Sequence, residues 1–284
     1  EAKLVRKEYA AAKCGNVSND VRVERGDMEN SFLKTACEIK ADFRTPIVEH
    51  ASLERDIAIA EPDYMNGGLT LYCPVQNVHG MREGICEALN LPVSKIRVIS
   101  PLIGGGFGGK ECSSVDCGVV AGVLALFTGR PVVYEMTREE VFRYTSKRHR
   151  SYIRYYLGVD EEGCITEMQS EAIFDKGAYK SVDVIPHRSA LLSGGPYSIP
   201  VVNVRNRSVY TNHVYGGAFR GLGAPQQQYA LECIIDDMAR TIGMDPIEFR
   251  LKNLIKEGST TIFSQKMNKN DVSGIRQCIE KGMH

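Results

Sequence analysis

The sequence predicts a chain of two lobes, each built of β-strands with covering α-helices. Between residues 69 and 135, apolar residues recur first at strand spacing and then at helical spacing, several times in succession. After residue 150 the pattern changes to longer segments that alternate in the manner of antiparallel strands. Each half also carries one glycine-rich loop directly before a predicted helix. This order of elements predicts mixed α and β structure in both lobes.

The boundaries follow from these changes of pattern. We expect residues 1–30 to be a polar lead-in segment, 31–149 to form the first lobe and 150–284 to form the second. The glycine loop of the first lobe is at 104–111, and the loop of the second is "GAFRGLGAPQ" at 217–226. A functional site is expected between the two lobes.

In the first lobe, "LTLYC" at 69–73 alternates as a strand, and the helix that follows covers 77–90. One stripe of that helix is apolar: Val78, Met81, Ile85 and Leu89. "KIRVIS" then returns as a strand before the glycine loop. A buried helix is expected over 113–129, with Ser113 as its N-cap and Gly129 as its stop. "RPVVYEM" follows as another strand.

In the second lobe, "SYIRYYLGV", the turn "DEEG" and "CITEMQSEAIF" predict a β-hairpin. "NVRNRSVYTN" is a further strand. The second glycine loop starts a helix with Pro225 in its first turn, running to about Gly243. A last helix begins at "DPIEF", with Asp245 as cap, Pro246 at the first position and Glu248 as the reciprocal partner.

The composition excludes several classes of protein. The 284 residues include 35 basic and 35 acidic side chains, a balance that argues against a dedicated nucleic-acid or membrane-surface binder. Nine cysteines are scattered without a C-x-x-C pair, which suits a reducing compartment and not a disulfide scaffold. No His or Cys spacing indicates a metal held directly by protein ligands. With no apparent signal peptide or apolar span, we expect a cytoplasmic location.

The first glycine loop satisfies two phosphate-binding motifs, and neither explains it. A P-loop needs Ser or Thr after its lysine to hold Mg²⁺, whereas Glu111 follows Lys110 here. A dinucleotide fingerprint needs an acidic residue about 20 positions onward, and the first acid after 116 is Glu135. Two interpretations stay open. The loop could present backbone N–H groups to a compact anion at a helix N-terminus, or it could be a tight turn filled by Phe107.

Four segments together resemble one family. These are "VQN" at 75–77, "GGGFGGKE" at 104–111, "GAFRGLGAPQ" at 217–226 and "DPIEFRLKN" at 245–253. They are similar to the molybdopterin-binding domain in the large, molybdenum-binding subunit of the xanthine dehydrogenase and aldehyde oxidase family. The resemblance runs from about Asp27 to Glu257. It implies an α+β fold with two related lobes of the molybdenum-cofactor-binding domain type.

The resemblance also implies what the chain works with. Its cofactor would be molybdenum–pyranopterin, for which the cytosine dinucleotide form is one option, and the pterin would hold the metal. The family's molybdenum chain is longer and carries its general-base glutamate in a later G-x-G-E motif, so no catalytic residue is expected in this chain. We therefore expect a fragment or a split subunit. Its partners would be the remaining molybdenum-subunit domains, with iron–sulfur clusters and FAD on partner domains or subunits.

Individual residues match the family's cofactor site. Gln76 matches the glutamine that approaches the metal's axial ligand, although a strand-end polar residue capping the next helix is the structural alternative. Gly106, Phe107 and Gly108 match the loop beside the molybdenum and the pterin. Arg220 matches an arginine whose loop contacts the cofactor; otherwise it would tie loop carbonyls together.

Substrate contacts are implied in the same way. Glu111 and Arg188 match a glutamate and an arginine that hold a heterocycle in purine-oxidising members. Their alternatives are a carboxylate at a helix N-terminus and a surface arginine in a loop. Leu222 stands where purine oxidisers usually carry an aromatic residue. Glu111 and Arg188 lead us to expect a molybdenum hydroxylase of xanthine-like or hypoxanthine-like N-heterocycles, whereas Leu222 weakens the xanthine assignment and leaves room for other substrates. Nicotinate oxidation, aldehyde oxidation and a non-catalytic fragment that binds no cofactor alone are the alternatives.

Overall fold

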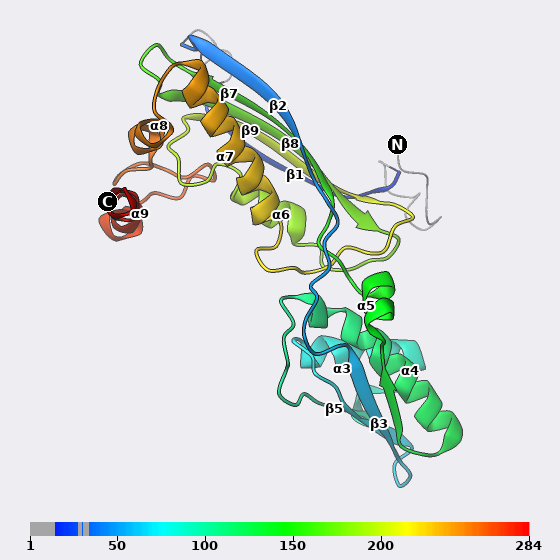
Figure 1. Cartoon of the computed structure of the whole chain (residues 1–284). Helices are drawn as coiled ribbons and strands as arrows, with labels where there is room; N and C mark the ends of the chain where they lie inside the picture. Colours follow the sequence, from blue (N-terminus) through cyan, green and yellow to red (C-terminus); the bar gives the residue numbers. More distant parts are fainter. Residues whose placement is uncertain (1–14, 28–29, 31–33, 284) are drawn as a thin grey trace.

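The structure is a computed structural model that describes residues 15–27, 30 and 34–283. It has two lobes, each with its own β-sheet (Figure 1). They are joined at a narrow waist, which the chain crosses twice, in segments 46–56 and 136–150. Helices cover one face of each sheet, so each lobe has a separate hydrophobic core. This confirms the α+β class.

The larger lobe contains a five-stranded sheet. In spatial order its strands are β1 (Val17–Arg25), β9 (Val201–Tyr210), β8 (Ile165–Gly177), β7 (Ser151–Val159) and β2 (Cys37–Thr45). The predicted hairpin is β7 and β8, which pair antiparallel, whereas β8 and β9 run parallel. Four helices accompany this sheet: α6 (Ile185–Leu191), α7 (Ala224–Thr241), α8 (Pro246–Asn253) and α9 (Lys269–Gly282).

Helix α7 forms the centre of the larger core. Leu231, Ile234 and Ile235 of its apolar stripe are fully buried against the sheet. They share this core with Phe174 of β8. The prolines in the first turns of α7 and α8 and the Asp245 cap, which accepts from two backbone N–H groups of α8, are confirmed. Among the described residues, no bond runs from the Asp245 N–H back to Glu248, so the reciprocal partner is not confirmed.

The smaller lobe contains a four-stranded sheet. In spatial order its strands are β5 (Ile96–Ile99), β4 (Gly68–Tyr72), β3 (Ile57–Asp63) and β6 (Val132–Glu135). Helices α3 (Val78–Leu89) and α4 (Ser113–Thr128) pack on it, with two short 3-10 turns, η1 (Val93–Lys95) and η2 (Gly109–Glu111). The predicted stripe of α3 is confirmed, since Met81 and Ile85 are fully buried. Helix α5 (Arg138–Tyr144) lies at the waist (Figure 1).

Two features of the helix at 113–129 differ from expectation. Ser113 is its first residue and not its N-cap; its hydroxyl instead bonds to Asp56 at 3.0 Å. The helix is also not buried all round, since Phe127 is 89% exposed. Gly129 ends the helix in the left-handed conformation, as predicted.

The strands do not divide at the expected boundaries. Residues 15–27 lie in the expected lead-in, yet Val17–Arg25 is β1 and pairs along its length with β9. Strand β2, expected in the first lobe, pairs with β7 in the sheet of the second. The chain thus leaves the larger sheet after Thr45, builds the smaller lobe and returns at Ser151, directly opposite Thr45. The reason is long-range pairing, which alternation in a single segment does not specify.

Candidate functional site

The first glycine loop lies at the waist and connects β5 to α4. It takes no part in a strand ladder, as predicted. Phe107 has a φ of 53° and is 49% exposed, so its side chain packs on the turn at Gly105 only in part. Gly108 has a φ of 102°, and a Cβ there would lie 2.6 Å from the carbonyl oxygen of Ala218. The two glycine loops are therefore in direct contact, and glycine is required at their closest point.

Gln76 is bound to this loop through one end of its side chain. Its Oε1 accepts a hydrogen bond from the N–H of Gly108 at 2.9 Å, and its backbone N–H donates to the carbonyl of Lys110 at 2.9 Å. Helix α3 is capped by Asn77 and not by Gln76. Within the described part of the chain, the Nε2 of Gln76 has no hydrogen-bond partner, so this exposed amide can donate outward.

Glu54 braces the loop from behind, which the sequence did not indicate. Its carboxylate accepts from the N–H of Gly104 at 2.8 Å and forms an ion pair with the buried Lys110. Burial alone would raise the pKa of Glu54, but the bonds from Lys110 and Gly104 together lower it. No local sequence signal joins positions 50 residues apart, so this brace could be found only from the fold.

The second glycine loop closes on the first through a main-chain bond. The N–H of Arg220 donates to the carbonyl of Phe107 at 2.9 Å. The Arg220 side chain is exposed and makes no hydrogen bond or ion pair in residues 15–27 and 34–283, so it does not tie loop carbonyls together. Leu222, with a φ of 48°, is half-buried and packs against the larger core.

His50 and Arg148 contact the second loop from the two segments that cross the waist. The Nε2 of His50 lies 2.7 Å from the carbonyl oxygen of Ala218, and Arg148 donates to the carbonyl of Arg220 at 2.9 Å. Burial lowers the pKa of His50, which favours the neutral imidazole. Neither residue is in a motif. The basic run at 147–150 that contains Arg148 predicts a solvated face, and this is wrong, because Lys147 and His149 are buried.

Glu111 lies on a cleft of about 810 Å³ between the lobes. The smaller lobe contributes the starts of α3 and α4 and the end of α5, and the larger lobe contributes the loops around Tyr179 and Tyr215. Asp116 lines the same cleft and accepts from the hydroxyl of Tyr215 at 3.2 Å. Burial raises the pKa of Asp116, and it raises the pKa of the nearby Cys112 to about 11. The cleft thus carries two carboxyl groups in a lining that also includes apolar side chains such as Val115 and Val182.

Arg188 lies in helix α6 and not in a loop. Its side chain is exposed, and no described residue forms an ion pair or hydrogen bond with it. The helix contacts the second glycine loop, because a Cβ on Gly223 would lie 2.9 Å from the carbonyl oxygen of Ile185. The structure therefore brings Gln76, the 106–108 segment and Arg220 into one contacting group. Glu111 lies on the adjoining cleft, and Arg188 lies on helix α6, which contacts the second glycine loop.

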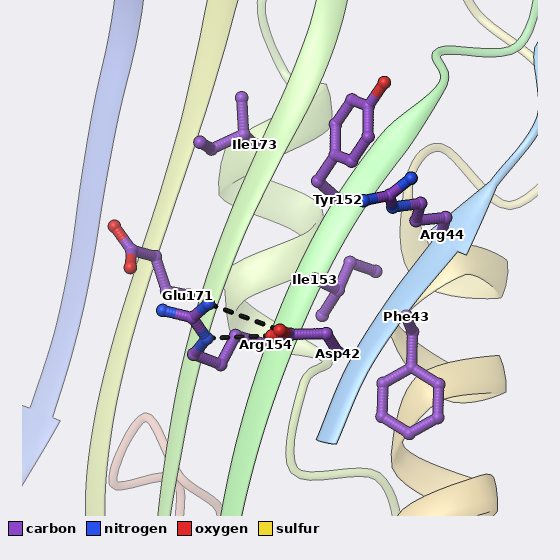
Figure 2. A pocket seen from close by; sticks show the side chains of 8 residues that line it. All are labelled: Asp42, Phe43, Arg44, Tyr152, Ile153, Arg154, Glu171 and Ile173. Atoms are coloured by element: carbon purple, nitrogen blue, oxygen red, sulfur yellow. Dashed lines mark hydrogen bonds and ion pairs between the residues drawn. The ribbon is translucent and has the colours of Figure 1, made fainter. Parts of the chain in front are cut away.

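Another pocket, of about 220 Å³, lies on the larger sheet away from these loops (Figure 2). Its polar groups are paired: Arg154 with Asp42 at 2.8 Å, Glu171 with Arg207 outside the pocket, and the Arg44 guanidinium lies 5.5 Å from the Tyr152 ring centre. Phe43 points away from them, toward α7, where it meets Tyr229 edge to face. We interpret this pocket as part of a solvated, cross-strand paired surface.

Two general features bear on the kind of site. No group of three or more His, Cys, Asp and Glu side chains suited to a metal is found among residues 15–27, 30 and 34–283. In the same part of the chain, no helix combines the length and apolar character needed to cross a membrane.

Comparisons with known proteins identify the family of the chain. The molybdopterin cofactor-binding domain family matches residues 11–254. The nicotinate dehydrogenase large molybdopterin subunit of Eubacterium barkeri is 33% identical over 94% of this chain and 62% of its own length. The xanthine dehydrogenase molybdenum-binding subunit of Escherichia coli O157:H7 is 29% identical over 94% of this chain and 35% of its own.

A solved structure of a related enzyme has the same fold as this chain. The aldehyde oxidoreductase of Desulfovibrio gigas superposes with a TM-score of 0.85 at 28% identity, over 99% of this chain and 31% of that protein. The chain therefore spans between about a third and about three fifths of the length of these relatives.

Proposed function

The chain belongs to the molybdopterin cofactor-binding domain family, and from this premise we propose that it is the cofactor-binding part of a molybdenum hydroxylase of N-heterocycles. Its relatives include oxidoreductases named for xanthine, nicotinate and aldehydes. The substrate class proposed here rests on Glu111 in the interlobe cleft and on Arg188.

The residues at the waist fit a molybdenum–pyranopterin cofactor. Among the described residues the outward amide of Gln76 has a free donor, and half of the Phe107 surface is open to solvent. Arg220 presents an exposed guanidinium beside them. This set offers a neutral donor, an aromatic surface and a cation without any protein ligand to a metal, which is what a pterin-held metal requires. The cytosine dinucleotide form of the pterin is part of the proposal.

When bound, the cofactor supplies the oxygen-transfer and electron-accepting chemistry. The chain's own residues bind and orient. Gln76 donates a hydrogen bond without adding charge, and the Gly108 N–H keeps its amide turned outward. Glu111 and Arg188 hold the heterocycle, with Arg188 stabilising negative charge that develops on the ring in the transition state.

One observation carries the proposal: the main-chain bond from Arg220 to Phe107 brings both glycine loops and Gln76 together at the edge of an interlobe cleft. Glu111 lines this cleft, whereas Arg188 lies outside its lining on α6, so the proposal requires the Arg188 side chain to turn toward a bound ring. An aldehyde offers few polar ring atoms to such a pair, whereas a purine or pyridine offers several.

The test is the turnover of the assembled enzyme with xanthine, hypoxanthine, nicotinate and benzaldehyde. We expect the heterocycles to be preferred, and Arg188→Met to lower kcat and kcat/KM together by roughly two to three powers of ten. Arg188→Lys should recover part of the loss, and Arg240→Met, a surface substitution on α7, should have no effect. A preference for benzaldehyde together with an unaffected Arg188→Met enzyme would refute the substrate class.

Nicotinate is the second candidate, because Leu222 packs into the larger core and offers no aromatic surface to a purine. The nicotinate dehydrogenase subunit is also the relative of which this chain covers the largest share among those named above. The same assay separates the two.

We further propose that this part works with the remaining molybdenum-subunit domains and with iron–sulfur and FAD components, in the cytoplasm. The basis is the share of the relatives' length that this chain leaves uncovered. Purification of the complex through a tag on this chain, followed by iron and flavin analysis, tests that composition.

A further inference from the structure

We infer that Phe219, held between His50 and Arg148, is an interlobe clamp that sets the relative position of the two glycine loops. Phe219 belongs to the second loop, whereas His50 and Arg148 come from the two segments that cross the waist. These three are positioning residues, because they act on the site through the loops that they hold. The inference rests on the proposed function, since that function assigns the cofactor to these loops.

The first half of the clamp is an aromatic stack. The rings of His50 and Phe219 lie 4.3 Å apart at an interplanar angle of 20°. The same imidazole bonds through Nε2 to the carbonyl of Ala218, at 2.7 Å. Its other face abuts the first loop, because a Cβ on Gly109 would lie 2.9 Å from the ring. One imidazole thus contacts both glycine loops.

The second half is a cation–π contact. The Arg148 guanidinium carbon lies 3.9 Å from the centre of the Phe219 ring. One nitrogen of the same group donates to the carbonyl of Arg220 at 2.9 Å, and another to Oε1 of Gln226 at 3.3 Å. Lysine could not reproduce this fork, because its ammonium is a single point of donation.

The two crossing segments are themselves tied together. Next to the clamp residues, Glu49 and Lys147 form a buried ion pair at 2.6 Å, and Lys147 also donates to the carbonyl of Val141 at 3.0 Å. The clamp therefore rests on a fixed base. The second glycine loop, which the clamp holds, is bonded to the first through the Arg220 N–H and the Phe107 carbonyl. The first loop in turn binds Gln76 through the Gly108 N–H.

A clamp of this kind predicts that weakening Phe219 or Arg148 separates the loops without unfolding either lobe, whose cores lie elsewhere. Pre-organised loops retain a ligand better than loops that must be ordered on binding. Arg148→Met should therefore loosen the Arg220–Phe107 bond and reduce cofactor retention, and Phe219→Tyr, which keeps the ring, should preserve both.

The experiment has two readouts. In the full 284-residue chain, hydrogen exchange of the Arg220 amide is compared with that of Leu231 in the larger core. We expect at least tenfold faster exchange of Arg220 in Arg148→Met, an intermediate increase in Arg148→Lys and no change at Leu231. Arg154→Met, a surface arginine of β7, is the matched control and should leave both amides unchanged. In the assembled enzyme, molybdenum and pterin content should fall in Arg148→Met and be retained in Phe219→Tyr.

The outcomes separate the clamp from the proposed function. Unchanged Arg220 exchange in Arg148→Met, or equal acceleration of Arg220 and Leu231 in both Arg148 variants, overturns the clamp whatever the enzyme binds. Faster exchange at Arg220 alone with undiminished cofactor content also overturns it as a positioning device. Wild-type assembled enzyme without molybdenum or pterin refutes the proposed function, and the exchange result then still decides whether the loops are held by these residues.

Discussion

Acidification should destabilise the protein through His149. This side chain is 2% exposed, and its ring packs so closely on Gly216 that a Cβ there would lie 2.7 Å away. Burial, with smaller effects of Lys176 and Arg148, lowers the pKa of His149 from 6.5 to about 4, although Asp175 opposes the change. The unfolded chain therefore takes up a proton as pH falls below 6.5, and the native chain does not do so until about pH 4.

The magnitude follows from the two pKa values. A tenfold change in proton affinity corresponds to about 1.4 kcal/mol, so a pKa lowered from 6.5 to about 4 removes about 3 kcal/mol of stability by pH 4. The loss is absent above pH 6.5 and grows as pH falls through this window. Carboxyl groups also titrate there, so the comparison must be made between variants.

The assay is urea unfolding of the full chain between pH 7 and pH 4, for the wild type and for His149→Gln. Glutamine cannot take up the proton, so the difference in free energy of unfolding between the two proteins should change by about 3 kcal/mol across this range, in favour of the variant at low pH. The exposed His79→Gln serves as the control and should follow the wild type. A difference that is the same at pH 7 and pH 4 would show that His149 does not carry the effect.

Three further predictions concern the loops and the cofactor. Gly108→Ala should lower the free energy of unfolding by about 1–3 kcal/mol more than Gly67→Ala, because both have positive φ but only Gly108 faces a carbonyl at 2.6 Å; equal losses in urea titrations would contradict the loop contact. Lys110→Met should cost about 2 kcal/mol, less than a fully buried pair because Glu54 is 31% exposed, and adding Glu54→Gln should recover part of it. An unaltered unfolding midpoint in Lys110→Met would argue against the brace. The isolated chain should hold less than about one tenth of an equivalent of molybdenum, since it spans 62% or less of the relatives named above and a small interface retains ligand poorly; elemental analysis near one equivalent would contradict this.

Local signals in the sequence predicted most elements of the fold. The apolar stripe of α3, the hairpin of β7 and β8 and the Asp245 cap all depend on residues within a few positions of one another, and all are present. Residues 37–45 were included in the first lobe without a predicted strand, whereas they form β2 in the sheet of the second, because the partner β7 begins more than a hundred residues later. Arg188 was placed in a loop, whereas Pro186 occupies the first turn of the short helix α6.

In the candidate site, too, the residues in motifs could be predicted and the long-range contacts could not. Motifs pointed to the two glycine loops and Gln76, which the structure brings into contact. The residues that hold the loops in place, Glu54, His50 and Arg148, could not be predicted. Each bonds to a residue at least 50 positions away in the sequence, and only the folded chain brings the two together. The roles of Glu111 and Arg188 toward a substrate stay predictions.

The insertion of the smaller lobe between β2 and β7 determines the order in which the protein can form during synthesis. All strands and the two main helices of the smaller lobe lie between Ile57 and Glu135, so this lobe has every partner that it needs soon after it leaves the ribosome. Strand β2 must wait for β7, which takes about 5–20 seconds at typical elongation rates, and β1 waits for β9 longer still. The second glycine loop emerges after β9, so the contact between the two glycine loops can form only after the strands of both sheets have been synthesised.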